Sequence, residues 1–290
     1  VPVTFTVIFI CGVLGNGLVM FVIMCMKRRA LRKVTNIYLI NLAVADLLVL
    51  LFCVPFTGLT YTLESWPFGK FVCKMVDYLM MTSMASSIWT MAAMSIDRYC
   101  AVVGPNCIKP YRTVRSTVGV LASIWVVNAI LFSPLLIMAQ IGFDEYEIEV
   151  LSHCFQKYPN RQSKRAYLVG VFLGYYVLPL IVTTASYFLL TRNMWGNIGP
   201  KLSRVHTLRA IRRHRHVCLM VLIMVCVFGI CWLPVYAVNL YNEFSSEDDQ
   251  FHEGVYVVLV VGHCLSYLNS ALNPIIYSFM SHIFRQCCKE

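Results

Sequence analysis

Seven apolar segments, each long enough to cross the hydrocarbon core of a bilayer, limit the fold of this sequence more than any other feature. Crossing such a core takes about 20 residues at roughly 1.5 Å of helix each. The segments cover residues 1–26, 35–63, 71–103, 117–139, 166–195, 217–243 and 254–280. Because only 13% of the residues are charged, about half the share found in an ordinary soluble domain, the sequence argues against a soluble protein.

Helices are the expected structure of these segments. Backbone polar groups in lipid must be satisfied inside a helix or a closed barrel, and runs of this length lack the two-residue alternation of barrel strands. We therefore predict an all-α membrane protein, a seven-transmembrane helix bundle formed by residues 1–280. Residues 281–290 are predicted to begin a short amphipathic eighth helix and the cytoplasmic tail. Cys287 and Cys288 could be acylated there, or could remain unmodified thiols.

The connections between the segments differ in charge on the two sides of the membrane. One alternating set holds 16 Lys and Arg and one acid, and consists of 27–34, 104–116, 196–216 and 281–290. The other set holds five Lys and Arg and nine acids, and consists of 64–70, 140–165 and 244–253. The positive-inside rule places the basic set in the cytoplasm and the amino terminus outside the cell. Since Val1 already lies in an apolar run, we expect an aqueous segment before it.

One carboxylate lies halfway along the second segment. Asp46 is far from either boundary with water, where an unpaired charge is costly. Polar groups at a similar depth in other segments are expected to surround it: Asn16, Ser87, Asn269, Ser270 and Asn273. Their oxygen atoms could hold a sodium ion. Alternatively, Asp46 could be protonated in a hydrogen-bonded core.

The third segment carries chemical groups at both of its ends. Cys73 lies near the outer end and Asp97-Arg98-Tyr99 at the cytoplasmic end, about 37 Å of helix apart. Arg98 could be a switch residue or an interfacial arginine whose head reaches water. Cys154, in the outer connection 140–165, shares with Cys73 the oxidising compartment in which disulfides persist. We expect these two to form a disulfide, with two free thiols as the alternative.

Prolines interrupt the last three segments. Pro179, Pro234 and Pro274 each remove a backbone hydrogen bond and permit a kink. Three kinked helices beside a cytoplasmic arginine indicate a protein that switches between two arrangements.

Helical spacing places several side chains on common faces near the outer end. Asp77, Met80, Met81 and Met84 share a face of the third segment, and Tyr236, Asn239, Leu240 and Glu243 share a face of the sixth. We predict a broad, aromatic outer cavity suited to the end of an amphipathic peptide, with core packing or lipid contact as the alternative. The predicted ligand-binding residues are Asp77, Met80, Met81, Met84, Phe155, Trp232, Tyr236, Asn239, His263 and Tyr267. Phe155 is expected to enter this cavity from a hairpin formed by residues 140–165.

The charged connections suggest partners on both sides. Outer acids could steer a basic peptide inward or simply be solvated: Asp144, Glu145, Glu147, Glu149, Glu247, Asp248 and Asp249. Inner bases could contact anionic lipid heads and a cytoplasmic partner, or lipid alone: Lys201, Arg204, Arg209, Arg212, Arg213 and Arg215. A basic excess confined to membrane connections gives no reason to expect nucleic acid as a partner.

Over essentially the whole chain, a set of motifs resembles the rhodopsin-like (class A) G-protein-coupled receptors. The motifs are Gly15-Asn16, Leu42 to Asp46, Trp66 to Gly69, Cys73 with Cys154, Asp97 to Tyr99, Trp125, Pro179 with Tyr187, Phe228 to Pro234, and Asn273 to Tyr277. The resemblance implies that Arg98 turns toward a G protein on activation and meets Tyr187 and Tyr277. It also implies that Trp232, with Ile88 and Phe228, relays contact with the agonist.

The resemblance further assigns two sets of site residues. The residues implied for the switch and for G-protein coupling are Asp97, Arg98, Tyr99, Tyr187, Phe228, Asn273, Pro274 and Tyr277. The residues implied for an allosteric sodium ion are Asp46, Ser87, Asn269 and Ser270. No cofactor other than this ion is expected.

Three departures from better-known branches narrow the possible ligand. Tyr267 stands where opsins carry the retinal lysine, and Met80 stands where amine receptors carry an aspartate. Some members pair the arginine with an acid at the foot of helix six, but Arg212 to His216 offers none, so we expect basal activity.

Several stretches look most like the galanin and allatostatin-A receptor group, with somatostatin- and opioid-like receptors as rivals. These stretches are Ser83-Met84, Ala92 to Tyr99, Lys164 to Tyr167 and His263 to Tyr267. We therefore expect a multi-pass plasma-membrane receptor, not an enzyme, that binds an extracellular peptide. Its implied partners are heterotrimeric G proteins of the inhibitory class, arrestin and receptor kinases. The alternatives are a non-peptide ligand, a constitutively active orphan receptor and, outside this class, a transporter.

Overall fold

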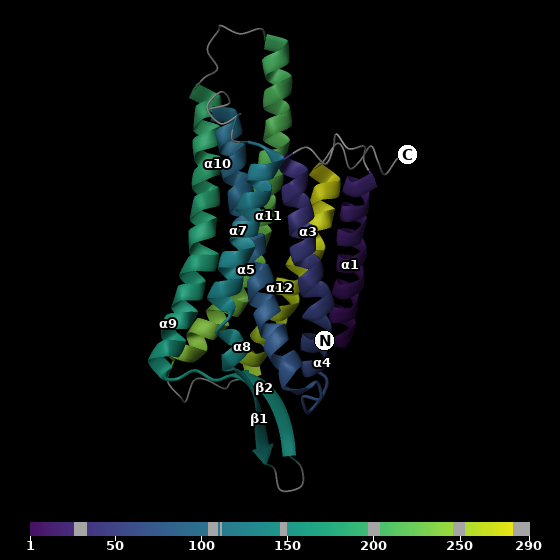
Figure 1. The fold of residues 1–290 in the computed structure, drawn as a ribbon, viewed down its shortest axis with the longest axis vertical. Helices are drawn as coiled ribbons and strands as arrows, with labels where there is room; N and C mark the ends of the chain where they lie inside the picture. The colour runs from purple at the N-terminus through teal and green to yellow at the C-terminus, as the bar shows by residue number, and fades with distance from the viewer. Residues whose placement is uncertain are drawn as a thin grey trace.

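The structure, a computed structural model, is a bundle of long helices with a small antiparallel hairpin at one end (Figure 1). It describes residues 1–25, 34–103, 110, 112–145, 150–196, 204–245 and 253–280. Seven helical stretches within these ranges are long and apolar enough to cross a membrane, which confirms the seven-helix, all-α architecture. The eighth helix predicted within 281–290, including Cys287 and Cys288, lies outside the described residues.

The elements follow one another along the chain with short interruptions. The helices of the first four spans are α1 (Pro2–Cys25), α3 (Val34–Phe52), α4 (Val54–Thr60), α5 (Gly69–Val103), α7 (Val114–Phe132) and α8 (Leu135–Met138). The hairpin consists of β1 (Ala139–Glu145) and β2 (Val150–Gln156). The remaining elements are α9 (Arg161–Phe172), the π-helical turn η1 (Leu173–Val177), α10 (Leu178–Gly196), α11 (Arg204–Phe244) and α12 (Glu253–Met280).

Proline divides spans that were predicted to be continuous helices. The predicted span 35–63 is split into α3 and α4, where Pro55 lies in the first turn of α4 and Cys53 precedes it. In the fourth span, Pro134 separates α7 from the single turn of α8. Proline lacks the N–H that an unbroken helix needs, so the helix restarts at each of these positions.

Side-chain caps explain why two helices begin earlier than their apolar runs. The Thr113 hydroxyl accepts a hydrogen bond from the Ser116 N–H at 3.1 Å, so α7 starts at residue 114 rather than 117. Asn160 Oδ1 accepts one from the Ser163 N–H at 2.7 Å, so α9 starts at 161 rather than 166. Caps of this kind satisfy backbone donors that the first helical turn leaves without partners.

The amino terminus, α4 and the hairpin lie at the same end of the bundle, which we call the outer end (Figure 1). In the hairpin, Ile141 is paired with Cys154. The Trp66 N–H donates a hydrogen bond to the Ser152 carbonyl oxygen at 2.7 Å, which joins the hairpin to the segment that leads into α5.

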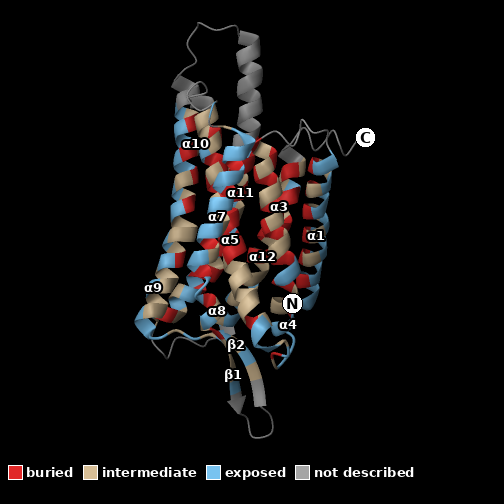
Figure 2. Cartoon of the chain, viewed as in Figure 1, coloured by how far each residue is buried: buried red, intermediate tan, exposed pale blue. Residues whose placement is uncertain are grey.

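Buried residues concentrate inside the bundle, and exposed ones lie on its outside (Figure 2). Many exposed side chains are apolar; Val3 and Ile137, for example, are each 76% exposed, as expected of surfaces that face lipid. Small residues allow close helix packing inside: a Cβ on Gly15 of α1 would lie 3.0 Å from Pro274 of α12.

A three-helix hydrogen-bond network holds the middle of the bundle together. The amide of Asn41 in α3 donates to Thr90 of α5 at 2.9 Å, and its oxygen accepts from the Trp125 indole N–H of α7 at 2.9 Å. One side chain therefore satisfies partners on two neighbouring helices, where water cannot replace it.

We expect Asn41→Ala to lower the free energy of unfolding by about 1–2 kcal/mol, because it leaves the Trp125 and Thr90 groups without this partner in an apolar setting. Thermal unfolding of the purified protein in detergent measures the effect. Ser123→Ala is the matched control, since the Ser123 hydroxyl bonds only within its own helix, to the Gly119 carbonyl. Equal unfolding temperatures for the two variants would contradict this assignment.

Candidate functional site

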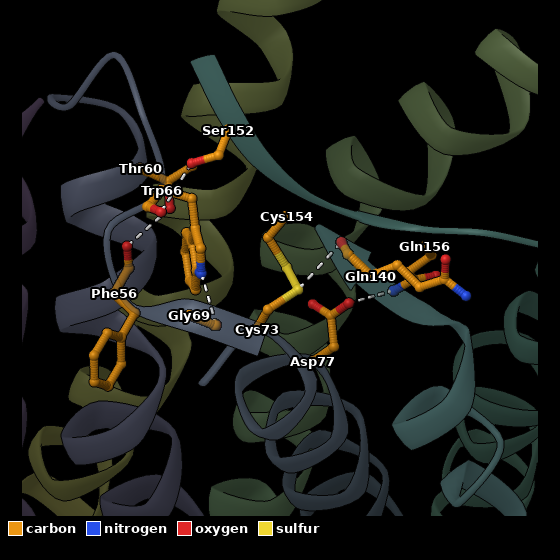
Figure 3. Close-up of a disulfide and its surroundings, with 10 residues drawn as sticks. All are labelled: Phe56, Thr60, Trp66, Gly69, Cys73, Asp77, Gln140, Ser152, Cys154 and Gln156. Atoms are coloured by element: carbon orange, nitrogen blue, oxygen red, sulfur yellow. Dashed lines mark hydrogen bonds between the residues drawn. A yellow bond between two sulfur atoms is a disulfide. The ribbon is translucent and has the colours of Figure 1, made fainter. Parts of the chain in front are cut away.

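A disulfide fixes the outer hairpin to helix α5. Cys73, in the second turn of α5, is bonded to Cys154 of β2, which confirms the disulfide expected from the sequence (Figure 3). Nearby, the Trp66 indole N–H donates to the Gly69 carbonyl at 3.0 Å. Gly69 has a φ of 74°, a backbone conformation that favours glycine, and α5 begins at this residue. Strand β2 is thus held over the outer end of α5.

Strand geometry decides which hairpin side chains face the bundle. Side chains alternate along a strand, so Gln156 lies on the same face as Cys154 and Phe155 on the other. Gln156 Nε2 donates a hydrogen bond to Asp77 Oδ2 at 3.0 Å (Figure 3). Phe155 is 37% exposed and packs against His153, with ring centroids 5.4 Å apart. The structure therefore brings Gln156, rather than Phe155, to Asp77.

A column of aromatic rings runs along the inner face of α11. Phe228 stacks on Trp232 at 5.9 Å between centroids, and Trp232 contacts Tyr236 at 6.1 Å. Tyr236 in turn packs against Tyr176 of η1 at 5.2 Å, and its hydroxyl points to the Met84 sulfur at 3.9 Å. Three of the predicted ligand-binding residues, Met84, Trp232 and Tyr236, therefore come together.

Other predicted ligand-binding residues lie at different positions around this column. Met80 and Met81 are partly buried and pack against the same core. Asn239 is exposed, unlike Tyr236 one turn before it. The buried face of the outer half of α11 is thus narrower than the face that we predicted from the spacing of residues in the sequence.

His263 and Tyr267 instead contact the short helix α4. The Tyr267 hydroxyl is 2.7 Å from Thr57 Oγ1, and its side chain is only 2% exposed. The Tyr61 hydroxyl is hydrogen-bonded to His263 Nδ1 at 2.5 Å, and burial raises the pKa of Tyr61 above its usual value. The structure places both residues where α4 meets α12, away from the column. The second span restarts as α4, with Pro55 in its first turn, and the hydroxyls of Thr57 and Tyr61 that follow are the partners of Tyr267 and His263.

Glu243, at the outer end of α11, is surrounded by bases from the first turns of α9. Its carboxylate is 4% exposed and lies 2.8 Å from Lys164 Nζ, 3.3 Å from Arg165 Nε and 3.4 Å from Arg161 Nε. Arg165 also lies over the Phe244 ring at 5.0 Å. This cluster joins the outer ends of α9 and α11 and fully compensates the buried acid.

The mid-membrane acid lies in a small polar cavity. Asp46 is 1% exposed and accepts a hydrogen bond from Asn273 Nδ2 at 2.8 Å. The cavity beside it measures about 10 Å³, roughly the space that one water molecule needs, and Ser87, Asn269 and Ser270 help to line it.

The side-chain groups that line this cavity present oxygen atoms, the ligands that hard cations prefer. Ser87 Oγ and Asn269 Oδ1 are buried and have no hydrogen-bond partner within the described residues. Together with the Asp46 carboxylate they offer oxygen ligands only. The described residues contain no cluster of three or more His, Cys, Asp or Glu side chains that would favour a transition metal.

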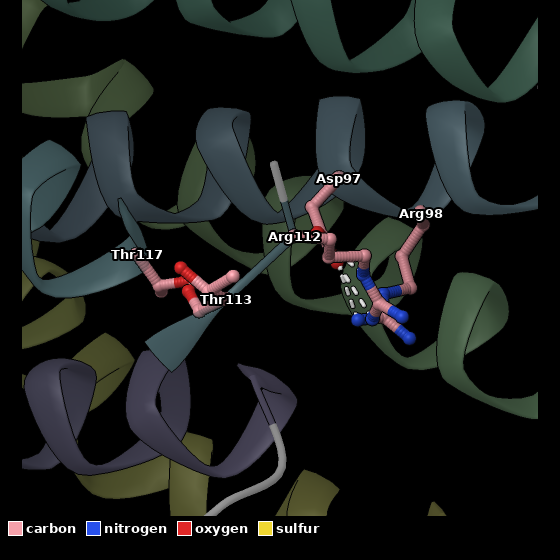
Figure 4. Close-up of polar contacts among 5 residues, drawn as sticks. All are labelled: Asp97, Arg98, Arg112, Thr113 and Thr117. Atoms are coloured by element: carbon pink, nitrogen blue, oxygen red, sulfur yellow. Dashed lines mark hydrogen bonds and ion pairs between the residues drawn. The ribbon is translucent and has the colours of Figure 1, made fainter. Parts of the chain in front are cut away.

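At the end of α5 that lies opposite the hairpin, two arginines share one carboxylate. Arg98 is 5% exposed and is paired with Asp97 beside it, while Arg112 Nε and Nη2 lie 2.8 and 3.0 Å from the two Asp97 oxygens (Figure 4). Arg98 also lines a small cavity together with Tyr187 of α10. The structure thus brings two of the predicted switch residues, Arg98 and Tyr187, to one cavity.

The remaining switch residues have separate positions. Tyr99 is partly buried beside Arg98, and Pro274 lies inside α12 without ending that helix. Tyr277 is 1% exposed, and its hydroxyl has no hydrogen-bond partner in the described part of the chain. The outer acids at 144–149 and 247–249 and the bases at 201–215 fall where the structure describes no side chains.

Sequence reasoning missed several residues of these sites, among them Gln156 and Arg112. Gln156 carries a signal that could have been used, because it follows Cys154 by two residues in an alternating strand. Arg112 lies in a connection, where no periodic pattern predicts contacts.

Comparisons with known proteins agree with this arrangement. Residues 15–277 match the family described as 7 transmembrane receptor (rhodopsin family). Galanin receptor type 1 of Mus musculus is 35% identical over 99% of this chain and 80% of its own length. The allatostatin-A receptor of Bombyx mori is 34% identical, covering 98% and 77% respectively. The KiSS-1 receptor of Mus musculus is 33% identical, covering 100% and 76%.

These relatives are receptors rather than enzymes, and the matched region includes Asp46, the Cys73–Cys154 disulfide, Asp97-Arg98-Tyr99 and the proline-containing helices. On this evidence the chain belongs to the rhodopsin family of seven-transmembrane receptors.

Proposed function

We propose that this chain is a multi-pass receptor of the plasma membrane that binds an extracellular peptide and activates heterotrimeric G proteins of the inhibitory class. The observation that carries the proposal is the buried Arg98, which is held by Asp97 at the opposite end of the bundle from the disulfide-anchored hairpin. The function of a transporter or of a structural membrane protein does not require a buried arginine in this position. The names of three relatives, receptors for galanin, allatostatin-A and KiSS-1, support a peptide as the ligand.

The aromatic column offers a physical route between the two ends. A ligand that contacts Tyr236 or Trp232 differently in two states shifts the balance between those states. Both side chains lie on α11 beside Pro234, where the missing backbone hydrogen bond lets the cytoplasmic half of the helix move. In the active state, Arg98 leaves Asp97 and turns toward the G protein.

Topology and partners complete the proposal. An extracellular amino terminus is supported by the disulfide at that end and by the basic connections at the other. The inhibitory G-protein class, arrestin and receptor kinases rest on the resemblance to galanin-type receptors.

A peptide-receptor function predicts ligand-dependent nucleotide exchange. The purified receptor in lipid nanodiscs is mixed with each of a panel of Gα subunits and with galanin, allatostatin-A or the KiSS-1 peptide. We expect at least one peptide to raise exchange, most strongly on inhibitory Gα. Exchange by folded receptor that no peptide changes would contradict the peptide assignment and favour a constitutively active receptor.

The switch role of Arg98 predicts that Arg98→Ala nearly abolishes exchange on every Gα subunit while the receptor still binds peptide. Arg112→Ala is the matched control, because Arg112 pairs with the same carboxylate but has a side chain that is 28% exposed. This control is expected to retain peptide-stimulated exchange. Normal exchange by the Arg98 variant would refute the role.

The cavity beside Asp46 predicts that sodium weakens agonist binding. A sodium ion there would supply the positive charge that the buried carboxylate lacks, and would favour the inactive arrangement. We expect agonist affinity to fall roughly 5- to 100-fold when sodium replaces potassium at equal ionic strength. In Asp46→Asn the affinity should be the same in both salts. If agonist binding by this variant stays fully sensitive to sodium, the assignment of a sodium ion to this cavity is wrong.

A further inference from the structure

Two acids at the outer end of the bundle, one buried and one partly buried, have different surroundings. Glu243 is buried and has three bases within ion-pair distance. Asp77 is partly buried, and in the described part of the chain its only hydrogen-bond partner is the neutral amide of Gln156. Neither Lys74, one turn before it on α5, nor Lys157, next to Gln156, lies within 4.0 Å as an ion-pair partner. Of these two acids, only Asp77 lacks a cation.

The Asp77 carboxylate is held in a defined position. Cys73 and Asp77 are four residues apart and share a face of α5, while Cys154 and Gln156 are two apart and share a face of β2. The disulfide therefore sets the distance across which Gln156 reaches Asp77 (Figure 3). Gln156 is itself oriented, because its Oε1 accepts a hydrogen bond from the Tyr158 hydroxyl at 2.5 Å. Its amide donates to one Asp77 oxygen and leaves Oδ1 for another donor.

Two tyrosines lie close to this carboxylate. The Tyr158 hydroxyl bonds to the same Gln156 side chain that bonds to Asp77, and burial, together with the negative charges of Asp77 and Glu243, raises the pKa of Tyr158. The rings of Tyr158 and Tyr167 pack at 5.6 Å between centroids. The Tyr167 hydroxyl is buried and has no hydrogen-bond partner among the residues described. A free carboxylate oxygen, a buried hydroxyl and aromatic faces are the groups that bind an organic cation.

We propose that Asp77 binds a cationic N–H group of the extracellular ligand, an ammonium or a guanidinium. The assignment rests on the proposed peptide-receptor function and names the chemistry that this receptor selects. A partly buried carboxylate is costly without a cation, and a ligand that supplies one gains a charge-assisted hydrogen bond to Oδ1. The bases of α9 do not compete for the ligand's cation site, because Glu243 already holds them.

The cation has two possible sources in a peptide: the α-amino group and a Lys or Arg side chain. Both donate N–H groups to a carboxylate, so the structure defines their shared chemistry. Two peptide analogues distinguish them. One has an acetylated amino terminus, and the other has each basic side chain replaced by a neutral one of similar length.

The test compares Asp77→Asn with the parent receptor, using whichever of galanin, allatostatin-A and the KiSS-1 peptide activates the parent. We expect the potency of that peptide to fall roughly 10- to 100-fold, the range for loss of a charged hydrogen bond. Glu64→Gln is the matched control, since Glu64 is an exposed acid at the same end and tests general charge attraction. Its effect should be within about twofold, as expected for a screened surface charge.

The peptide analogues complete a double-substitution cycle. On the parent receptor, one of the two analogues should be weaker than the unmodified peptide by the same factor as Asp77→Asn weakens the unmodified peptide. On Asp77→Asn, that analogue and the unmodified peptide should be equally potent. Asp77→Glu, which keeps the charge, should recover part of the potency. Surface expression and thermal unfolding of each variant show that it is folded.

The outcomes separate the two proposals. If a peptide activates the parent receptor and retains full potency on Asp77→Asn, the cation site is overturned and the peptide function stands. If both analogues lose further potency on Asp77→Asn, the cation binds elsewhere and the assignment is also overturned. If no peptide activates folded parent receptor that still exchanges nucleotide, the peptide function and the assignment that rests on it both fall.

Discussion

A backbone inside a bilayer has no water to bond with, and this constraint underlies every other feature of the molecule. Each span must satisfy its own N–H and C=O groups, so the spans are helices and differ chiefly in their side chains and in the places where proline interrupts them. Pro55 and Pro134 divide their spans near the outer end, and the π-helical turn η1 precedes Pro179. The interruptions give an otherwise uniform bundle its local shapes, including the short helix α4 against which His263 and Tyr267 pack.

The same lack of water determines how charges are arranged. Asp97 is paired with two arginines and Glu243 with three bases, and these clusters lie at opposite ends of the bundle. Asp46 and Asp77 are bonded instead to the amides of Asn273 and Gln156, which supply no positive charge. The first pair of acids holds helices and connections together, whereas the second pair is the one to which we assign a cation from outside the chain.

The sequence predicts the number of spans because apolar length alone defines them. It predicts the disulfide because the two cysteines are expected on the same side of the membrane. It predicts less well where helices start, since caps such as Thr113 and Asn160 lie outside the apolar runs. Helical spacing places Met84 and Tyr236 on helix faces that we expected to converge, and the Tyr236 hydroxyl lies 3.9 Å from the Met84 sulfur. The partners of Tyr267 and Asp77 depend on a restarted helix and on strand alternation, which spacing within a helix does not contain.

The anchored hairpin also affects the thermodynamics of ligand capture. Strand β2 is fixed by Cys154 on one side and by the Ser152–Trp66 backbone hydrogen bond on the other. A wall that is already ordered loses little conformational entropy when a ligand arrives, so more of the contact energy remains as affinity. Because affinity differences among ligands of one site lie mostly in the dissociation rate, we expect this gain to lengthen the lifetime of the complex.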